Sequence, residues 1–384
     1  MDTLGAGQDG WFARPAARRW RCAAPSESAR SFHASLPGYS PTPLVGLPSL
    51  AEELGVSRVL VKDESSRLGL PAFKVLGASW AVSRVVARRA GLAGTPGLAA
   101  LKEAAGGAPL TLVTATDGNH GRAVAKMASL LGIRSYVVVP QVMSDQAAAG
   151  IAAEGADVVR NDGDYDAALR RAAGHARTHP DAELVQDVAW PGYEEVPGWI
   201  VEGYATLCLE VDEAMARDGL GRPGLVVVPV GVGSLAQAVI AHYRSRGTDP
   251  APGVLSVEPD TAACALASLR RGGPCSVRTR DTIMTGLNCG TLSTAAWPCL
   301  REGLDGAVSV RDEEAARAVE DLAALGVSSG PSGAATLAGA RAALTGAGAA
   351  GRRAQLGVDP GSVVVLLSTE GGPAQGPSGP GPHD

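Results

Sequence analysis

Lysine is scarce in this sequence of 384 residues, and its scarcity makes one lysine informative. Of the 34 basic side chains, only those at positions 62, 74, 102 and 126 are lysines, so arginine supplies almost all of the positive charge. Lys74 nevertheless lies in an apolar stretch, "LPAFKVLGAS". Arginine stays protonated in proteins, whereas lysine can lose its proton and act as a nucleophile. The position of Lys74 therefore indicates chemistry that an arginine cannot perform.

Other features of the composition narrow the class of protein. No apolar run approaches the ~20 residues that a membrane-spanning helix needs. The net charge of -5 argues against a general electrostatic grip on nucleic acid or on an anionic membrane. The six cysteines show no C-x-x-C spacing, so neither a zinc site nor a disulfide framework is indicated, although one local pair stays open. The first thirty residues lack the apolar centre of a secretion signal, and we expect a cytoplasmic protein without a bound metal.

Short β-branched runs alternate with longer helical segments along most of the chain. Segments such as "YDAALRRAAGHART" place apolar residues three and four apart and have an acidic first turn. Strands that are apolar throughout are typical of parallel sheets covered on both faces. We therefore predict an α/β protein whose parallel sheets are covered by helices and face each other across a cleft. The predicted strands are 57–62, 111–114, 135–140, 156–160, 183–187, 225–230, 253–259, 306–310 and 362–368.

Three loops at the carboxyl ends of predicted strands look specialised, and ligands gather at such ends in α/β proteins. The first loop leads into a helix that begins near Phe73. A lysine in that first turn is expected to have a lowered pKa, because the helix dipole and burial both disfavour an ammonium group. A neutral amine there can form a Schiff base. Alternatively, the stem of Lys74 packs against the protein while its head group reaches solvent.

The second loop, "TATDGNHGRAVA", spans residues 114–125. Gly118 lets a ligand approach the backbone, and the N-terminus of the next helix offers free N–H groups to a carboxylate or a phosphate. Asp117 adds a carboxylate, Asn119 can donate or accept a hydrogen bond, and His120 can titrate. Because "DGN" is also common in turns, Asp117 or Asn119 alternatively caps the helix.

The third loop, "PVGVGSLAQAV", has the composition of a phosphate cradle made of backbone amides. Gly231, Gly233 and Ala236 also satisfy the G-x-G-x-x-A form of the dinucleotide fingerprint, and Glu258 stands at the end of the next strand, where a ribose-binding acid would be. An NAD-dependent oxidoreductase is therefore a rival hypothesis, although it leaves Lys74 and the second loop unexplained.

Taken in order, "AFKVLGAS", "TDGNHGR" and "PVGVGSL" resemble the fold-type II pyridoxal-phosphate enzymes, the group that contains threonine dehydratase and tryptophan synthase β. Five further segments resemble the diaminopropionate ammonia-lyase family: "FHASLPGYSPTPL", "KDESSRLGLPAFK", "QDVAWPGYEEVPGWIVEGY", "TIMTGLNCG" and "LLSTEGG". The resemblance runs from about residue 31 to residue 372. It implies a large cofactor-binding domain of residues 31–79 and 191–371, and a small mobile domain of residues 80–190. Residues 1–30 are expected to form a loosely ordered extension, and residues 372–384, rich in proline and glycine, a disordered tail.

The resemblance implies a role for each matching residue. Lys74 would hold pyridoxal 5'-phosphate as a Schiff base, and Asn119 would bond the ring hydroxyl. A hydroxyl of Ser368 or Thr369 would face the pyridine nitrogen, which favours elimination over transamination. The cofactor phosphate would bind to Gly231, Val232, Gly233 and Ser234. The substrate would bind to Thr116, Asp117, Gly118, His120 and Asp187.

Two aspartates bear on the substrate. Relatives that eliminate water usually have Ser-Ser-Gly-Asn-His in the second loop, whereas this chain has a carboxylate at Asp117. A β-ammonium group entering a dry site needs an anionic neighbour, and Asp187 supplies a second one; their alternative roles are helix cap and turn residue. The implied activity is α,β-elimination of 2,3-diaminopropionate to pyruvate and two ammonia molecules. It would proceed through Cα deprotonation by Lys74 or Asp117 and release of aminoacrylate.

Two other hypotheses stay open beside the oxidoreductase. A serine or threonine dehydratase, or a related eliminase, would use the same cofactor on another amino acid. A non-catalytic module would bind the cofactor without turnover. The resemblance also implies a homodimer acting in amino acid catabolism, with no nucleic acid or membrane partner.

Overall fold

Two parallel β-sheets form the framework of the protein. The computed structural model describes residues 10–245 and 251–372. A seven-stranded sheet has the order β1-β10-β9-β8-β11-β3-β2, and a four-stranded sheet has the order β6-β5-β4-β7. Strand pairs are parallel except at the two edges formed by β1 and β2. The predicted α/β class with parallel sheets is therefore confirmed.

All nine predicted strands are present, and all but β7 agree with the prediction to within one residue at each end. The large sheet contains β1 (Trp11–Ala13), β2 (Leu44–Gly46), β3 (Arg58–Asp63), β8 (Leu225–Pro229), β9 (Gly253–Pro259), β10 (Gly306–Val310) and β11 (Val363–Ser368). The small sheet contains β4 (Thr111–Ala115), β5 (Arg134–Pro140), β6 (Asp157–Asn161) and β7 (Ala182–Leu184). Strand β7 is shorter than predicted, and β1 and β2, each of three residues, were not predicted because neither has a β-branched run.

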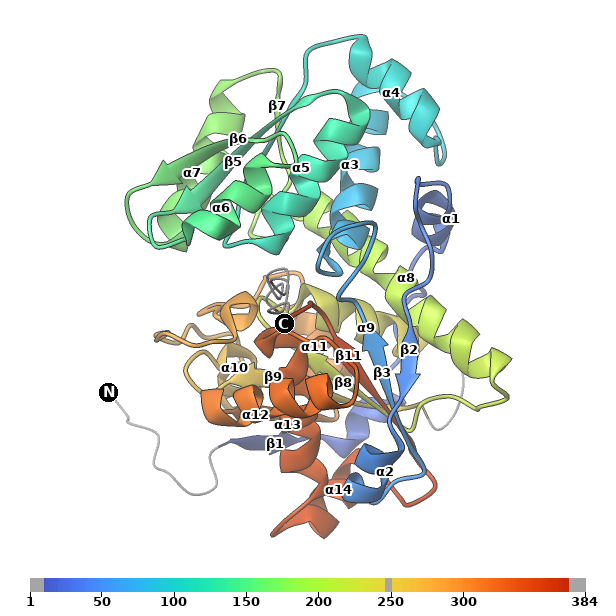
Figure 1. Cartoon of the computed structure of the whole chain (residues 1–384). Helices are drawn as coiled ribbons and strands as arrows, with labels where there is room; N and C mark the ends of the chain where they lie inside the picture. Colours follow the sequence, from blue (N-terminus) through green and yellow to red (C-terminus); the bar gives the residue numbers. More distant parts are fainter. Residues whose placement is uncertain (1–9, 246–250, 373–384) are drawn as a thin grey trace, which may run out of the picture.

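Helices cover both sheets, as Figure 1 shows. Around the small sheet lie α3 (Lys74–Ala90), α4 (Leu98–Gly106), α5 (Asn119–Leu131), α6 (Asp145–Ala152) and α7 (Tyr165–Thr178). Around the large sheet lie α2 (Pro48–Leu54), α9 (Ser234–Ser245), α10 (Cys264–Arg271), α11 (Trp297–Gly303), α12 (Asp312–Ala324), α13 (Pro331–Leu344) and α14 (Ala349–Leu356). The remaining helices are α1 (Ser28–Ala34), the long α8 (Glu195–Arg217) and two short 3-10 helices, η1 (Pro15–Arg19) and η2 (Thr285–Leu287). Within the described residues, no helix is both long and apolar enough to cross a membrane.

One continuous core joins the two sheets. The apolar residues of α3, α5 and α8 are buried in a single cluster with residues of β8 and β11. Close packing here depends on glycine: a Cβ atom on Gly203 of α8 would lie 2.4 Å from the carbonyl oxygen of Leu76 in α3. The predicted domain boundary between residues 79 and 80 falls inside α3, and this helix contacts both α5 and α8.

A buried ionic cluster fixes the loop that precedes Lys74. The Arg67 guanidinium, 0% exposed, donates hydrogen bonds to the carboxylates of Glu64 and Glu210 at 2.6–2.9 Å. Lys62 donates to Glu210 at 2.6 Å. Two cations thus face two anions, which offsets the cost of burying each charge. The loop that leads to Lys74 is consequently held against α8.

Of the expected loose extension, residues 1–9 lie outside the described residues, and residues 10–30 differ from the expectation. Strand β1 pairs antiparallel with β10, and Arg18 of η1 donates to Asp305 at 2.9 Å. Trp11 donates through its indole N–H to Gln355 at 2.9 Å. The strand pairing and these two side-chain bonds therefore tie the segment to the part of the molecule that contains the large sheet. Of the expected disordered tail, residues 373–384 lie outside the described residues.

Candidate active site

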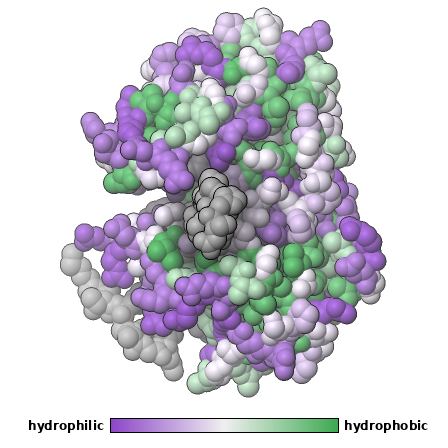
Figure 2. All heavy atoms as spheres, viewed as in Figure 1, coloured by the Kyte–Doolittle hydropathy of each residue, from purple (hydrophilic) through white to green (hydrophobic). Residues whose placement is uncertain are grey.

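The three specialised loops meet in one cavity of about 970 Å³ between the two sheets. Its wall comes from the start of α3, from the loops after β4, β6, β8 and β11, and from the segment after β7, together with residues 276–279 and 285–292. On the face drawn in Figure 2, the surface is hollowed between the two parts of the molecule. The cavity wall includes every predicted site residue except Ser368.

Lys74 is the first residue of α3 and is paired with a carboxylate. Its Nζ atom donates to Oδ2 of Asp187 at 2.6 Å, and 24% of the lysine side chain is exposed. Burial, the largest single effect, would lower the pKa of Lys74, but the charges and the hydrogen bond around the amine, those of Asp187 first, together raise that pKa well above the ordinary lysine value. The predicted lowering of the Lys74 pKa was therefore wrong for the protein itself, because the prediction did not include the direct contact between Asp187 and Nζ.

The Thr116 hydroxyl, and not Asp117 or Asn119, bonds to the backbone at the start of α5. The Thr116 hydroxyl accepts hydrogen bonds from the backbone N–H groups of Gly118 at 2.9 Å and Gly121 at 3.0 Å. Neither Asp117 nor Asn119 makes a side-chain cap of α5, so their alternative reading as helix caps does not hold. Asp117 lies on the cavity wall and is open to solvent within the cleft. The cavity walls exclude part of the water around the Asp117 carboxylate, and this desolvation raises its pKa. The nearby Lys74 charge opposes the rise.

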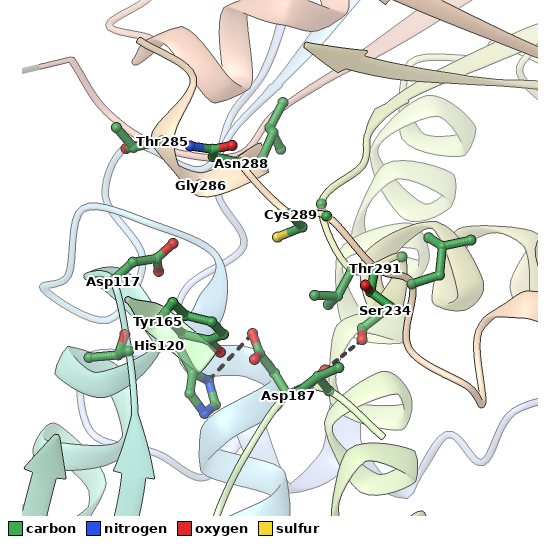
Figure 3. A pocket seen from close by; sticks show the side chains of 18 of the residues that line it. Asp117, His120, Tyr165, Asp187, Ser234, Thr285, Gly286, Asn288, Cys289 and Thr291 are labelled. Atoms are coloured by element: carbon green, nitrogen blue, oxygen red, sulfur yellow. Dashed lines mark hydrogen bonds and ion pairs between the residues drawn. The ribbon is translucent and has the colours of Figure 1, made fainter. Parts of the chain in front are cut away.

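Asp187 lies at the centre of the polar groups. Burial would raise its pKa, but the Lys74 ammonium outweighs burial and holds the pKa of Asp187 well below its usual range. The His120 ring donates through Nε2 to the Val185 carbonyl at 2.9 Å, and its Nδ1 atom is buried without a hydrogen-bond partner, 3.9 Å from Asp187 Oδ2. Figure 3 shows the side chains of Asp117, Tyr165 and Asp187 directed into the same space.

Side chains hold the segment that carries Asp187. After the short strand β7, the Tyr193 hydroxyl donates to the Leu184 carbonyl at 2.8 Å and accepts from the Gln186 N–H at 2.9 Å. The Gln186 side chain in turn accepts from the backbone N–H of Ala115 at 3.0 Å. These bonds continue the link to β4 beyond the end of the strand pairing, so Asp187 is fixed to the second loop.

The third loop forms a turn that only small residues can occupy. A Cβ atom on Gly231 would lie 3.0 Å from the Gly286 carbonyl oxygen and 3.1 Å from the Cys289 sulfur. Gly233 has a φ of +96°, in the region that favours glycine. Helix α9 begins at Ser234, so its first N–H groups, which have no partner within the helix, point toward the cavity. The Ser234 hydroxyl donates to the Asp187 carbonyl at 2.7 Å, which leaves its oxygen available as an acceptor.

The end of β11 separates the two predicted hydroxyls. Ser368 is fully buried and donates to the Ser329 hydroxyl at 2.7 Å. Thr369 lies on the cavity wall, as does Glu370. The residues of the cavity wall that were not predicted include Glu370, two residues after the end of β11, and Tyr165, the first residue of α7 after β6. The position of each at the carboxyl end of a strand was the signal that could have identified both.

The structure rules out the ribose-binding role of Glu258 on which the dinucleotide hypothesis depends. Its side chain is 0% exposed, and its two carboxylate oxygens accept from the N–H groups of Ala265 and Leu266 at 2.7 and 2.8 Å. Burial raises the pKa of Glu258 to about 7. A carboxylate enclosed at the N-terminus of α10 cannot reach a ribose in the cavity.

The cavity fits the pyridoxal phosphate that the sequence led us to expect. The Lys74 amine, the turn of backbone amides at the N-terminus of α9 and the Thr369 hydroxyl all lie on the wall of this cavity. Three buried polar atoms on that wall have no protein partner: His120 Nδ1, Asn288 Oδ1 and Ser332 Oγ. Unpaired buried polar atoms are costly unless a ligand or water satisfies them. Among the described residues, no group of three or more histidine, cysteine, aspartate or glutamate side chains could hold a metal ion.

Comparisons with known proteins agree with this geometry. Residues 36–369 match the family model described as pyridoxal-phosphate dependent enzyme. The diaminopropionate ammonia-lyase of Escherichia coli K12 is 38% identical over 290 residues, which cover 75% of this chain and 72% of that protein. A crystal structure of the Escherichia coli holoenzyme has a TM-score of 0.85 at 33% identity and covers 94% of this chain and 93% of that one. Another, in complex with an aminoacrylate-PLP azomethine reaction intermediate, has a TM-score of 0.83 at 32% identity over 94% of this chain and 93% of that one.

Proposed function

This chain belongs to the pyridoxal-phosphate dependent enzymes and, within them, to the diaminopropionate ammonia-lyases, and from that premise we propose that it eliminates ammonia from 2,3-diaminopropionate. The overall reaction consumes one water molecule and yields one pyruvate and two ammonia molecules. The enzyme is thus a carbon–nitrogen lyase.

The observation that carries this proposal is the position of one amine among carboxylates. Lys74 Nζ contacts Asp187, and Asp117 lies on the wall of the same cavity. A substrate with two amino groups brings positive charge into this space, and burying such charge without an anionic partner is costly. Two carboxylates beside one lysine therefore suit a leaving group that is an amine.

Several residues would hold the cofactor. Lys74 would bind it covalently, Asn119 and Thr369 would contact its ring, and the turn of residues 231–234 would receive its phosphate at the N-terminus of α9. When bound, pyridoxal phosphate supplies an aldehyde that reacts with amines and an aromatic ring that withdraws electrons from the substrate Cα. A hydroxyl, rather than a carboxylate, facing the pyridine nitrogen suits elimination.

The protein's own groups move the protons. The N–H groups of the second loop, with Thr116, Gly118 and His120 beside them, would receive the substrate carboxylate. Asp117 or Lys74 would remove the proton from the substrate Cα, and such acid–base groups typically contribute 10²–10⁴-fold each. With the Lys74 amine held by the cofactor, the Asp187 carboxylate would be available to accept hydrogen bonds from the substrate β-ammonium group. Aminoacrylate released from the site would hydrolyse to pyruvate and the second ammonia.

A second candidate function is that of a serine or threonine dehydratase, or a related eliminase. The carboxylate at Asp117 disfavours it, because a hydroxyl leaving group brings no charge that a carboxylate would neutralise. Parallel assays of 2,3-diaminopropionate, serine and threonine, with pyruvate or oxobutyrate as the readout, separate the two functions. Faster turnover of serine or threonine than of diaminopropionate would overturn the ammonia-lyase proposal.

Lys74 provides the direct test of the cofactor site. Borohydride reduction of the cofactor-loaded enzyme, followed by peptide mapping, is expected to place the label on Lys74, and Lys74→Ala is expected to abolish both the label and pyruvate formation. A label on another side chain, or none, would contradict the assignment. Binding of the cofactor without turnover of any of the three amino acids would favour a non-catalytic module.

Three further features complete the proposal. The enzyme acts as a homodimer in the cytoplasm and serves amino acid catabolism by producing pyruvate. Residues 80–190 move as a small domain relative to residues 31–79 and 191–371 when substrate enters. Sedimentation of the purified protein tests the dimer directly.

A further inference from the structure

Glu370 joins the two sides of the cavity through its carboxylate. Oε2 accepts from the Asn119 side-chain amide at 3.0 Å, and Oε1 accepts from the Ser332 backbone N–H at 3.2 Å. Asn119 begins α5 beside the small sheet, whereas Ser332 lies in the first turn of α13 on the large sheet. One carboxylate therefore connects helices that belong to different sheets.

The backbone leaves this carboxylate little freedom. The Glu370 carbonyl accepts from the Gly330 N–H at 2.9 Å, and the adjacent Thr369 carbonyl accepts from the Phe73 N–H at 3.1 Å. A Cβ atom on Gly330 would lie 2.9 Å from Glu370 Cγ and 3.0 Å from Oε1. The absence of a side chain at Gly330 thus makes the space in which the Glu370 side chain sits.

A carboxylate at this place decides which way the Asn119 amide points. An ionised carboxylate only accepts hydrogen bonds, so Asn119 must present its NH₂ group to Glu370. The second N–H of that NH₂ group and the Asn119 carbonyl oxygen then have fixed directions. Burial raises the pKa of Glu370, while its bonds to Ser332 and Asn119 oppose the rise.

We propose that Glu370 is a positioning residue for the cofactor: it fixes the orientation of the Asn119 amide that contacts the cofactor ring. The inference rests on the proposed function, in which Asn119 faces that ring. Glu370 acts through Asn119 and not through its own contact with substrate. It also ties the ring-binding side chain to the strand end that carries Thr369, so both ring contacts are placed by one segment.

Glu370→Gln is the sharpest test, because glutamine has nearly the same shape. If its carbonyl oxygen keeps accepting from the Ser332 N–H, its NH₂ group faces Asn119, and Asn119 must then turn its own carbonyl oxygen toward residue 370. Titrating cofactor-free protein with pyridoxal phosphate, followed by visible absorbance and tryptophan fluorescence, gives the dissociation constant without any turnover. We expect E370Q to raise this constant about tenfold, as for the loss of roughly one charge-assisted hydrogen bond, and to shift the absorbance maximum of the bound cofactor.

Combining E370Q with Asn119→Ala tests whether Glu370 acts through Asn119. If it does, N119A removes the group that Glu370 orients, and the double variant E370Q/N119A binds the cofactor within about twofold of N119A alone. Effects that multiply in the double variant would overturn the proposal, as would wild-type affinity in E370Q. Asp166→Asn is the matched control, since it removes another carboxylate from the cavity wall that makes no bond to Asn119; its affinity is expected within about twofold of wild type.

The titration distinguishes a failure of the proposed function from a failure of the role of Glu370. If wild-type protein fails to bind pyridoxal phosphate, the proposed function itself fails. If wild type binds and E370Q matches it, only the role of Glu370 fails. Should E370Q not fold, Glu370→Asp keeps the charge but withdraws the carboxylate from Asn119; we expect the same weakening from it, and unchanged affinity would overturn the proposal.

Discussion

Replacing Asp187 with asparagine removes the carboxylate that keeps Lys74 protonated. Two unit charges about 4 Å apart interact by about 4 kcal/mol at an effective dielectric constant of about 20. The contact between Lys74 Nζ and Asp187 Oδ2 is closer, at 2.6 Å, but 24% of the lysine side chain is exposed in the cavity. Halving the interaction for the screening by this water gives about 2 kcal/mol.

This energy converts to a reactivity that can be measured. A loss of about 2 kcal/mol corresponds to about a 30-fold larger fraction of neutral amine at a fixed pH near 8. Brief acetylation of the cofactor-free protein, quantified by peptide mass spectrometry, should therefore modify Lys74 about 30-fold faster in D187N than in wild type. The exposed Lys102 is the internal control, and its rate should be unchanged.

The pH dependence follows from the direction of the two pKa shifts. The raised pKa of Lys74 means that the pair is fully present below the ordinary lysine pKa and is lost as the pH rises through the raised value. The lowered pKa of Asp187 means that the pair is present above the ordinary aspartate pKa and is lost as the pH falls through the lowered value. The pair therefore holds across neutral pH. Equal Lys74 rates in wild type and D187N, or equal acceleration at Lys102, would refute the ion-pair argument.

Three other substitutions test separate parts of the site. Asp117→Asn should lower kcat for diaminopropionate by about 10²–10⁴-fold while the dissociation constant of the cofactor changes less than about threefold; normal turnover would exclude Asp117 as the base. Tyr193→Phe removes the hydroxyl that bonds Leu184 and Gln186, so we expect about 1–3 kcal/mol less stability by chemical denaturation and a lower kcat, and wild-type values of both would contradict its holding role. Gly231→Ala places a Cβ atom 3.0 Å from a carbonyl oxygen; the resulting shift of the turn should weaken cofactor binding at least about tenfold, measured by titration, and unchanged affinity would argue against a phosphate site there.

Long apolar runs made most of the fold predictable from sequence. The nine predicted strands lie in the parallel parts of the two sheets, and β4, β8 and β9 are buried throughout, as runs of β-branched residues in such sheets usually are. The edge strands β1 and β2 have no such run, because each pairs on one side over only three residues. Strand β7 ends earlier than "ELVQD" suggests, since Tyr193 and Gln186 replace the last backbone pairs with side-chain bonds.

The site was predictable where its residues sit at strand ends, and the contacts between loops were not. The sequence placed Lys74, Asp117 and the turn of residues 231–234 at one edge, and the structure brings them to one cavity. The direction of the Lys74 pKa shift depends on Asp187, 113 residues away in sequence. The bond between Glu370 and Asn119 spans 251 residues. Pairings of this kind depend on tertiary packing, which periodicity does not encode.

Strand β1 has a practical consequence for work on this protein. It covers β10, the last parallel strand on that side of the large sheet. A shortened protein that begins at residue 31 would keep every residue of the cavity, yet its β10 would display unpaired N–H and C=O groups to other molecules. Exposed strand edges of this kind recruit further strands and cause aggregation. The N-terminal residues thus keep the edge of β10 paired, although they contribute no atom to the wall of the active-site cavity.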